Sequence, residues 1–313
     1  MPAILAAASI IKYLIRLDNT SISTPIQVRP LDSNPNRLRL TPFQGIPRLD
    51  YVVSAAEAKG VKLVLPLLNN FDALGGISTY TNAFGGTHNS FYTDAASQAA
   101  YKAWIKLIVN RYKSSSAIFS WELCNEPRCS GCSTSVITNW ASDVSAYIKS
   151  LDPNHMVAIG DEGWLTPPLS DGSYAYSGYE GVDFVKNLAI STLDYGTFHL
   201  YPDQWGYNYT WGNEWIIQHN LIGKQAGKPV VLEEYGSTDA TKTTIAQPYQ
   251  QTVLQNTSVA YDSFWQFATT LSGGVNPYDN YAIQYSTTPG SDYDILGYQH
   301  AAAMLAKNPV ANQ

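Results

Sequence analysis

From residue 46 onward, segments with helical periodicity alternate with short apolar runs, and this alternation limits the possible folds more than any other feature. Short apolar runs flanked by Gly, Pro and Asn are typical of buried parallel strands. Parallel strands need crossover connections, which helices usually supply. A strand–helix alternation over one domain of this size therefore predicts an α/β protein with a (β/α)8 TIM barrel rather than an open sheet.

The elements of this barrel can be assigned from the apolar spacing. The expected helices are Pro47–Lys59, Asp94–Tyr112, Ser135–Leu151, Val182–Leu188, Trp211–Gln225, Thr244–Gln255 and Gly297–Ala306. The expected strands are Val61–Leu67, Ala117–Trp121, Met156–Ile159, Gly196–Leu200, Pro229–Leu232 and Ser263–Phe267. Asp94 is a suitable N-cap for the helix that begins there.

The first 45 residues fit the barrel poorly. If Val61–Leu67 is the third strand, they must supply two strands and a helix, although one βα unit takes about 30 residues. Ala3–Leu17 is the candidate for helix 1 and Ile26–Arg29 for strand 2, but no strand 1 precedes them. We therefore expect an atypical N-terminal segment, 1–45, whose strand 1–strand 2 region is atypical or incomplete, and a catalytic barrel domain, 46–313.

Composition excludes several classes of partner. Only 14% of the residues are charged and the net charge is −6, so no basic surface for nucleic acid is expected. No apolar run approaches the ~20 residues of a membrane span, and no ligand cluster indicates a metal or a cofactor. Aromatic residues make up 12% of the chain, which suits stacking against a neutral ligand such as a sugar.

Cysteines and sequons favour a secreted protein. Cys124, Cys129 and Cys132 lie close together, without the second pair or nearby His that a zinc site needs. Sequons at Asn19, Asn208 and Asn256 permit glycosylation. The apolar stretch Ala3–Ile11 lacks the basic region and cleavage site of a signal peptide. We expect an extracellular protein with one short disulfide and one buried thiol.

Polar residues gather where four of the expected strands end, which is where a (β/α)8 barrel places its active site. These strand ends are Ser120–Arg128, Phe198–Pro202, Val231–Gly236 and Phe264–Phe267. Two carboxylates across one barrel mouth are what glycoside cleavage requires, because one protonates the departing oxygen while the other attacks or screens the anomeric carbon. Taken singly, each Glu fits a salt-bridged rim residue, His199 a hydrogen-bonded barrel histidine and Trp265 a core residue. The four strand ends together favour an active site.

From about Gly45 onward, the chain resembles the fungal secreted endo-β-1,4-mannanases of glycoside hydrolase family 5 (subfamily 7, clan A). The matching motifs are Arg48–Val53, Trp121–Cys132, Gly160–Gly163, Phe198–Trp205 and Leu232–Gly236. The resemblance covers about five-sixths of the chain. It implies retaining hydrolysis of β-1,4-mannosidic linkages in mannan, galactomannan and glucomannan by two glutamates, without metal or cofactor, in a protein that we expect to be a monomer.

The resemblance also assigns the catalytic residues. Glu126 would be the acid/base, Asn125 beside it would hold the sugar 2-hydroxyl, and Glu234 would be the nucleophile. Glu233 is the alternative nucleophile. Successive strand side chains point to opposite faces, however, so we expect only one of the two glutamates to face the barrel mouth.

Further positions in the matching motifs would bind substrate. His199 and Tyr201 would bracket the nucleophile, and Trp265 would stack under the sugar being cleaved. Arg128, Glu162 and Trp164 would line the leaving-group side. The alternative for Arg128 is a salt bridge to Glu162 at the barrel rim.

The chain departs from the family at three places. The family's Arg-Val-Trp-Gly of strand 2 is missing, and Arg29 replaces its Arg only by approximate position. On strand 3 the chain has Asn69-Asn70-Phe71-Asp72 where the family has Trp, so Phe71 would supply the aromatic contact. Of the family's disulfides, only the Cys129–Cys132 pair is left. Two alternatives stay open: a related family 5 β-glucanase or cellulase, and a mannan-binding barrel with impaired catalysis.

Overall fold

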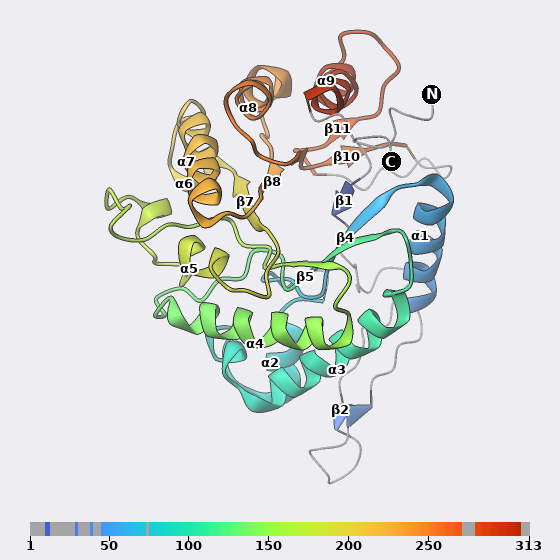
Figure 1. Ribbon diagram of the computed structural model, residues 1–313, viewed down its shortest axis with the longest axis vertical. Helices are drawn as coiled ribbons and strands as arrows, with labels where there is room; N and C mark the ends of the chain where they lie inside the picture. The colour runs from blue at the N-terminus through green and yellow to red at the C-terminus, as the bar shows by residue number, and fades with distance from the viewer. Residues whose placement is uncertain are drawn as a thin grey trace. The chain divides into compact units, whose positions relative to one another are not determined.

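The computed structural model describes residues 10–12, 29–30, 38–39, 45–72, 75–270 and 279–307 (Figure 1). These residues belong to two compact units, the first within residues 10–196 and the second within residues 197–307. Among the described residues, no helix is long and apolar enough to span a membrane.

The first unit is built on a four-stranded parallel sheet. Its strands run in the order β1 (Ile10–Lys12), β4 (Lys62–Pro66), β5 (Ile118–Glu122) and β6 (Met156–Ala158). The helices are α1 (Gly45–Lys59), α2 (Ser78–Phe84), α3 (Ala95–Tyr112), α4 (Ser135–Leu151) and α5 (Phe184–Leu188). Strands β4 and β5 are almost wholly buried, as expected for continuous apolar runs in a parallel sheet.

Helix α3 fixes the carboxyl ends of two strands. It begins after Asp94, whose carboxylate accepts a 2.7 Å hydrogen bond from the Ser97 N–H. From its buried face, the Trp104 indole donates to the carbonyl of Leu67 beyond β4, and the Tyr101 hydroxyl donates to the carbonyl of Leu123 beyond β5. α3 therefore holds the two segments from which candidate site residues follow.

The second unit contains a three-stranded sheet in the order β7 (Gly196–Leu200), β8 (Val230–Tyr235) and β9 (Asp262–Phe264). Its helices are α6 (Pro202–Trp205), α7 (Trp211–Ala226), α8 (Lys242–Asn256) and α9 (His300–Lys307). A further pair of short parallel strands, β10 (Phe267–Ala268) and β11 (Ile283–Gln284), follows the sheet. In Figure 1, α7 and α8 follow β7 and β8 along the chain, as the strand–helix alternation predicts.

Most predicted elements are confirmed, with ends that differ by a few residues. The bounds of α4, Ser135–Leu151, and β7, Gly196–Leu200, are those expected from the sequence. The last helix differs from the prediction, because a π-helix spans Tyr293–Gln299 and α9 itself begins only at His300. The strand predicted over Ser263–Phe267 is interrupted, since β9 ends at Phe264 and β10 begins at Phe267.

In the N-terminal segment, the predicted helix is wrong where the structure describes it, and the strand predicted to end at Arg29 has a different partner from the one expected. Ile10–Lys12, expected within a helix over Ala3–Leu17, form β1, whose partner β4 lies about 50 residues away. Arg29 and Pro30 form β2, which pairs antiparallel with β3 (Leu38–Arg39) instead of joining the parallel sheet. The pairing of β1 with β4 depends on distant residues, so the local pattern does not reveal it. The remaining residues of Ala3–Leu17 and Ile26–Arg29 lie outside the described part of the chain.

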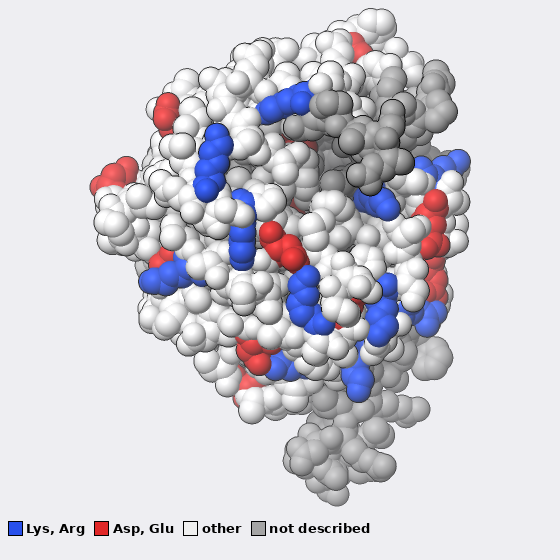
Figure 2. Space-filling view, viewed as in Figure 1, with Lys and Arg blue, Asp and Glu red and all other residues white. Residues whose placement is uncertain are grey.

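The low charge of the chain is visible on the face in Figure 2. Most of the visible described surface is uncharged, and Lys and Arg side chains are interspersed with Asp and Glu. This agrees with a composition in which 14% of residues are charged.

Candidate active site

Glu126 follows β5 and has an unusual backbone conformation. Its N–H donates a 2.8 Å hydrogen bond to the carbonyl of Gly160, and the N–H of Asn125 donates a 2.9 Å bond to the carbonyl of Leu68. These contacts extend the sheet pairing beyond the strand on both sides. The φ angle of Glu126 is 51°, in a left-handed region that costs a residue with a side chain about 1–3 kcal/mol. The buried, strained Glu126 is therefore a candidate functional residue.

Gly160 must be glycine for this arrangement. Its φ angle is 85°, and a Cβ atom there would lie 2.1 Å from the carbonyl oxygen of Cys124 and 2.4 Å from Oε1 of Glu122. Both contacts are too close for any side chain. The glycine that opens the Gly-Asp-Glu-Gly motif therefore lets the segment after β6 approach the segment that holds Glu126.

Two asparagines that follow β4 contact residues around Glu126. Oδ1 of Asn69 accepts a 3.1 Å hydrogen bond from Nδ2 of Asn125, and Oδ1 of Asn70 accepts a 3.2 Å bond from the N–H of Arg128. Sequence reasoning selected only Phe71 from this motif, although Asn69-Asn70 was itself the signal. Phe71 is 45% exposed, and its ring centroid lies 5.6 Å from the guanidinium carbon of Arg128.

Arg128 and Glu162 form a two-point ion pair. Nε and Nη2 of Arg128 lie 2.7 and 2.6 Å from the two carboxylate oxygens of Glu162, and the Trp164 indole donates a 3.0 Å bond to the same carboxylate. Burial alone would lower the pKa of Arg128, but Glu162 and Glu126 raise it above its usual value. The salt bridge that was the alternative interpretation of Arg128 is therefore present, and its Glu162 side chain is buried.

The same cation also approaches the candidate acid/base. Nη2 of Arg128 lies 3.8 Å from Oε2 of Glu126. Arg128 therefore connects the carboxyl group of Glu126 with the ion pair and with the indole of Trp164, whose ring centroid is 5.9 Å from the guanidinium carbon.

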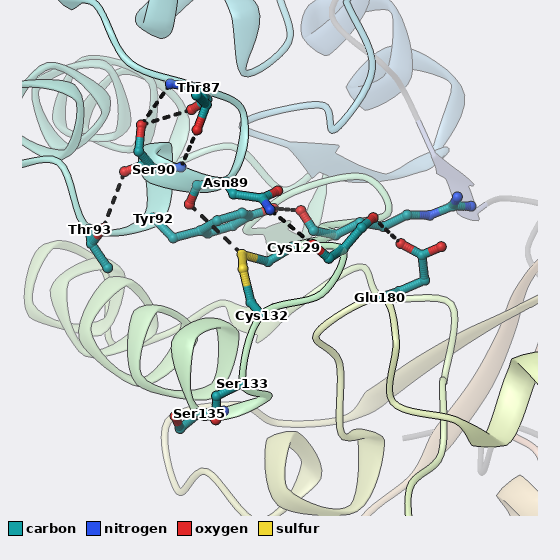
Figure 3. The surroundings of a disulfide bond; sticks show 12 residues. Thr87, Asn89, Ser90, Tyr92, Thr93, Cys129, Cys132, Ser133, Ser135 and Glu180 are labelled. Carbon is teal, nitrogen blue, oxygen red and sulfur yellow. Dashed lines mark hydrogen bonds between the residues drawn. A yellow bond between two sulfur atoms is a disulfide. The ribbon is translucent and has the colours of Figure 1, made fainter. Parts of the chain in front are cut away.

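The cysteines behave as expected. Cys129 and Cys132 are joined by a disulfide (Figure 3), which follows Arg128 directly in the sequence. Cys124 is buried and lies outside this disulfide. The hydroxyl of Tyr92 donates a 3.0 Å hydrogen bond to the carbonyl of Arg128 and so fixes the chain just before the disulfide loop.

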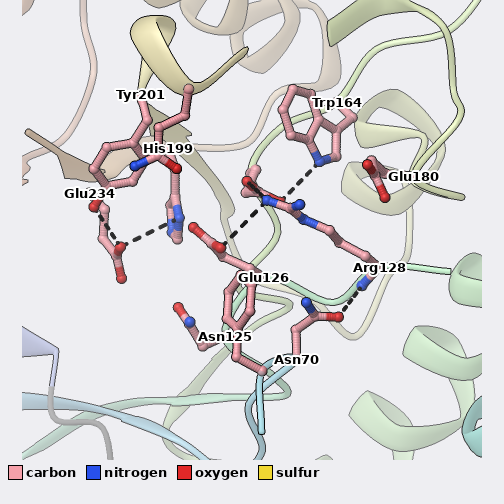
Figure 4. A network of polar contacts seen from close by, with 12 residues as sticks. Asn70, Asn125, Glu126, Arg128, Trp164, Glu180, His199, Tyr201 and Glu234 are labelled. Atoms are coloured by element: carbon pink, nitrogen blue, oxygen red, sulfur yellow. Dashed lines mark hydrogen bonds and ion pairs between the residues drawn. The ribbon is translucent and has the colours of Figure 1, made fainter. Parts of the chain in front are cut away.

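In the second unit, the carboxylate of Glu234 on β8 contacts His199 of β7 and Tyr201, which directly follows β7. The hydroxyl of Tyr201 donates a 3.0 Å hydrogen bond to Oε2 of Glu234, and Nδ1 of His199 lies 3.7 Å from the same oxygen (Figure 4). Glu234 is 6% exposed and His199 is fully buried. This carboxylate therefore has both a hydrogen-bond donor and an imidazole beside it.

Glu233 contacts the same imidazole. Its Oε2 lies 3.4 Å from Nε2 of His199, so the two neighbouring glutamates contact different nitrogens of one ring. The register between β8 and β9 shifts between Leu232 and Tyr235. Strict alternation of side chains therefore does not describe this stretch, and it does not by itself separate Glu233 from Glu234.

Trp265 lies at the end of the second unit's sheet and is partly exposed. Its indole donates a 3.0 Å hydrogen bond to Oδ2 of Asp279, which sequence reasoning missed because no motif includes it. A Cβ atom on Gly236 would lie 2.7 Å from the Trp265 carbonyl oxygen and 2.9 Å from the Tyr281 ring. The glycine after Glu-Glu-Tyr is therefore needed for this close approach.

The predicted site residues thus form two groups, each brought together within its own unit. The first unit holds Phe71, Asn125, Glu126, Arg128, Glu162 and Trp164, and the second holds His199, Tyr201, Glu234 and Trp265. The side chain of Arg29, the suggested replacement for the family's strand 2 Arg, lies outside what the structure describes. Each group presents at least one buried glutamate with defined partners, which suits acid–base or nucleophilic chemistry at a carboxyl group.

Comparison with known proteins identifies the family. The family model described as GH family 5 beta-mannosidase-like matches residues 82–271, more than half of the chain. The probable mannan endo-1,4-beta-mannosidase A of Aspergillus flavus is 50% identical over 264 residues, which cover 84% of this chain and 67% of that protein.

Two solved structures are similar to the chain. The endo-1,4-beta-mannanase of Rhizomucor miehei aligns with a TM-score of 0.83 and 33% identity, covering 97% of this chain and 89% of that one. The endo-beta-1,4-mannanase of Thermotoga petrophila aligns with a TM-score of 0.79 and 34% identity, covering 88% of this chain and 66% of that one. The chain thus spans about two thirds of the length of the A. flavus and T. petrophila proteins.

The family 5 mannanases are (β/α)8 barrels, so the fold class predicted from the strand–helix alternation is confirmed. The resemblance drawn from the motifs is confirmed as well, because the family model spans both Glu126 and Glu234. The chain belongs to glycoside hydrolase family 5, in its β-mannosidase-like group.

Proposed function

We propose that this chain is a retaining endo-β-1,4-mannanase with Glu126 as the acid/base and Glu234 as the nucleophile. The main support is the coincidence of two independent observations. Both glutamates lie in the motifs shared with the mannanases, and each is buried with defined partners. The named activity of the 50% identical relative supports the same assignment.

The reaction has two steps. In the first, a carboxylate oxygen of Glu234 attacks the anomeric carbon while Glu126 gives its proton to the glycosidic oxygen, so the leaving sugar departs and a glycosyl ester forms. In the second, Glu126 removes a proton from water, which attacks the anomeric carbon and releases Glu234. Two inversions give net retention. Tyr201 orients the nucleophile through its hydrogen bond.

The remaining site residues bind substrate in this proposal. Asn125 holds the sugar 2-hydroxyl, Trp265 stacks under the sugar being cleaved, and His199 borders the nucleophile. On the leaving-group side, Arg128 and Trp164 face the departing sugars, while Glu162 orients Arg128 through their ion pair. Phe71 adds an exposed ring beside Arg128.

The substrate that we propose is a β-mannan polymer or oligosaccharide, bound by a monomer. Residues 46–313 would form the catalytic barrel domain, preceded by the atypical segment 1–45. The Cys129–Cys132 disulfide and the sequons support secretion, since disulfides persist in oxidising compartments.

Reducing-end release from galactomannan and from carboxymethyl cellulose tests the substrate class. We expect release from galactomannan in large excess. The reverse preference would identify a β-glucanase. Binding to insoluble mannan without release would identify a binding barrel.

Proton NMR of the first product decides the stereochemistry: the β-anomer should appear first, and an initial α-anomer would contradict retention.

A further inference from the structure

Glu180 is a buried carboxylate that no motif indicated and to which the proposed chemistry gives no role. It is 7% exposed and lies in the segment before α5. Each of its carboxylate oxygens accepts one hydroxyl: Oε2 lies 2.5 Å from the Ser130 hydroxyl oxygen, and Oε1 lies 2.5 Å from that of Tyr174. Glu180 therefore joins two segments that are far apart in the sequence.

The Ser130 contact leads to the backbone of Arg128. Ser130 belongs to the disulfide loop Cys129–Cys132, which begins directly after Arg128. The N–H of Cys129 donates a second hydrogen bond, of 2.8 Å, to the carbonyl of Glu180. Glu180 therefore fixes the loop through its side chain and its backbone, next to the residue whose guanidinium approaches Glu126.

The Tyr174 contact leads to the partner of that guanidinium. The ring of Tyr174 packs edge-on against Trp164, with 5.0 Å between ring centroids. The indole of Trp164 donates to Glu162, and Glu162 binds both Nε and Nη2 of Arg128. Figure 4 shows Glu180 beside Trp164 and Arg128. The contacts thus form a closed network. From Glu180, one branch runs through the disulfide loop to Arg128, and the other runs through Tyr174 and Trp164 to Glu162.

We propose that Glu180 is a positioning residue that sets the orientation of Arg128, and thereby the affinity for the sugars on the leaving-group side. The expected effect on substrate affinity rests on the proposed function. Hydrogen bonds to a carboxylate are strong, and buried networks couple their members. A glutamine in place of Glu180 leaves only one acceptor oxygen for the Ser130 and Tyr174 hydroxyls, so at least one side of the ion pair loses its support.

The kinetic test uses Glu180→Gln, which keeps the shape but replaces one acceptor oxygen by an amide NH2. On β-1,4-mannopentaose, which places sugars on the leaving-group side, we expect KM to rise about tenfold, the scale of coupling within one network. On an aryl β-mannobioside, whose leaving group is not a sugar, kcat and KM should stay within about twofold of the wild type.

Whether Glu180 affects KM through Arg128 is tested by combining Glu180→Gln with Arg128→Ala. In Arg128→Ala, Glu180→Gln should raise KM for mannopentaose less than about twofold further, because the residue that it positions is gone. The matched control is Asp152→Asn, which alters another buried carboxylate with two side-chain partners. We expect it to lower stability without changing KM on either substrate. An equal change on both substrates, or full additivity with Arg128→Ala, would overturn the proposal.

A spectroscopic measurement decides the proposal independently of catalysis. In a ¹H–¹⁵N spectrum, Glu180→Gln should shift the Trp164 indole and Arg128 Nε resonances, whereas Asp152→Asn should leave both in place. Unchanged resonances in a folded Glu180→Gln would contradict the positioning role. If the wild type hydrolysed neither substrate, the proposed function would fail, while these resonances would still decide whether Glu180 orients Arg128.

Discussion

The hydroxyl of Tyr201 donates a 3.0 Å hydrogen bond to Oε2 of Glu234, and both side chains are buried. A hydrogen bond to an ionised carboxylate is stronger than one between neutral groups, and a rigid phenol restricts the rotation of its partner. This contact therefore orients the proposed nucleophile before substrate binds.

Tyr201→Phe should lower kcat on galactomannan by roughly 10- to 100-fold, because a hydrogen bond to a charged group contributes about 1.5–3 kcal/mol. The measurement is steady-state kinetics at equal concentrations of folded protein. Tyr112→Phe is the matched control, since its hydroxyl also donates to a carboxylate, that of Asp50, at 2.8 Å. Equal losses in both variants would show that Tyr201 acts through stability alone.

Glu126→Gln should separate substrates by the quality of their leaving groups. The amide cannot donate the proton that a sugar leaving group needs, so hydrolysis of mannan should slow by about 10²–10⁴-fold. An aryl β-mannoside with an acidic phenol needs little protonation, so the glycosyl-enzyme should still form at nearly the normal rate. A phenol burst measures that step.

Comparing mannan with the aryl mannoside distinguishes loss of the acid from a general loss of activity in Glu126→Gln. Glutamine retains the size of Glu126 and can adopt the same backbone, whose φ of 51° is set by contacts on both sides. If the variant were equally slow on mannan and on the aryl mannoside, Glu126 would not be the acid.

Asp152 contributes a pH-dependent part of the stability. Burial alone would raise its pKa, but hydrogen bonds from the Trp121 indole, the Asn154 N–H and His155 outweigh burial and hold the pKa below 3.8. Because the folded pKa is depressed, the stabilisation is complete above the unfolded pKa of about 3.9 and is lost as pH falls through the folded pKa.

Urea unfolding of the wild type and Asp152→Asn between pH 7 and pH 2 measures this effect. At pH 7 the variant should be less stable by about 1–3 kcal/mol, the usual cost of leaving buried partners unsatisfied. The difference should shrink as the pH falls below 4. A difference that is constant over the whole range would exclude ionised Asp152 as the cause.

Local sequence patterns predicted the elements that are defined by local periodicity. Helix α4 shows this best, because its apolar face over Ser135–Leu151 specifies both its length and its burial. The patterns failed at Ile10–Lys12, where pairing with β4 decides the structure. Strand pairing joins residues distant in the sequence, so local propensity does not determine it.

For the candidate site, the sequence indicated some residues but not the contacts between distant segments. Motifs located Glu126 and Glu234 because chemistry restricts those positions to few residue types. No sequence pattern indicated the positive φ of Glu126, since its cause is hydrogen bonding to segments after β4 and β6. Glu180 was missed because it lies in no motif, and its importance comes from contacts with Ser130 and Tyr174.

We propose that Glu234, rather than its neighbour Glu233, forms the covalent intermediate, although both contact His199. A 2-deoxy-2-fluoro-β-mannosyl fluoride tests it most directly, because the fluorine at carbon 2 slows hydrolysis of the glycosyl ester while fluoride leaves readily. Peptic digestion and mass spectrometry then locate the ester. If Glu234 is the nucleophile, each chain carries one label, on Glu234. A label on Glu233, or turnover of the reagent without any ester on the protein, would contradict it.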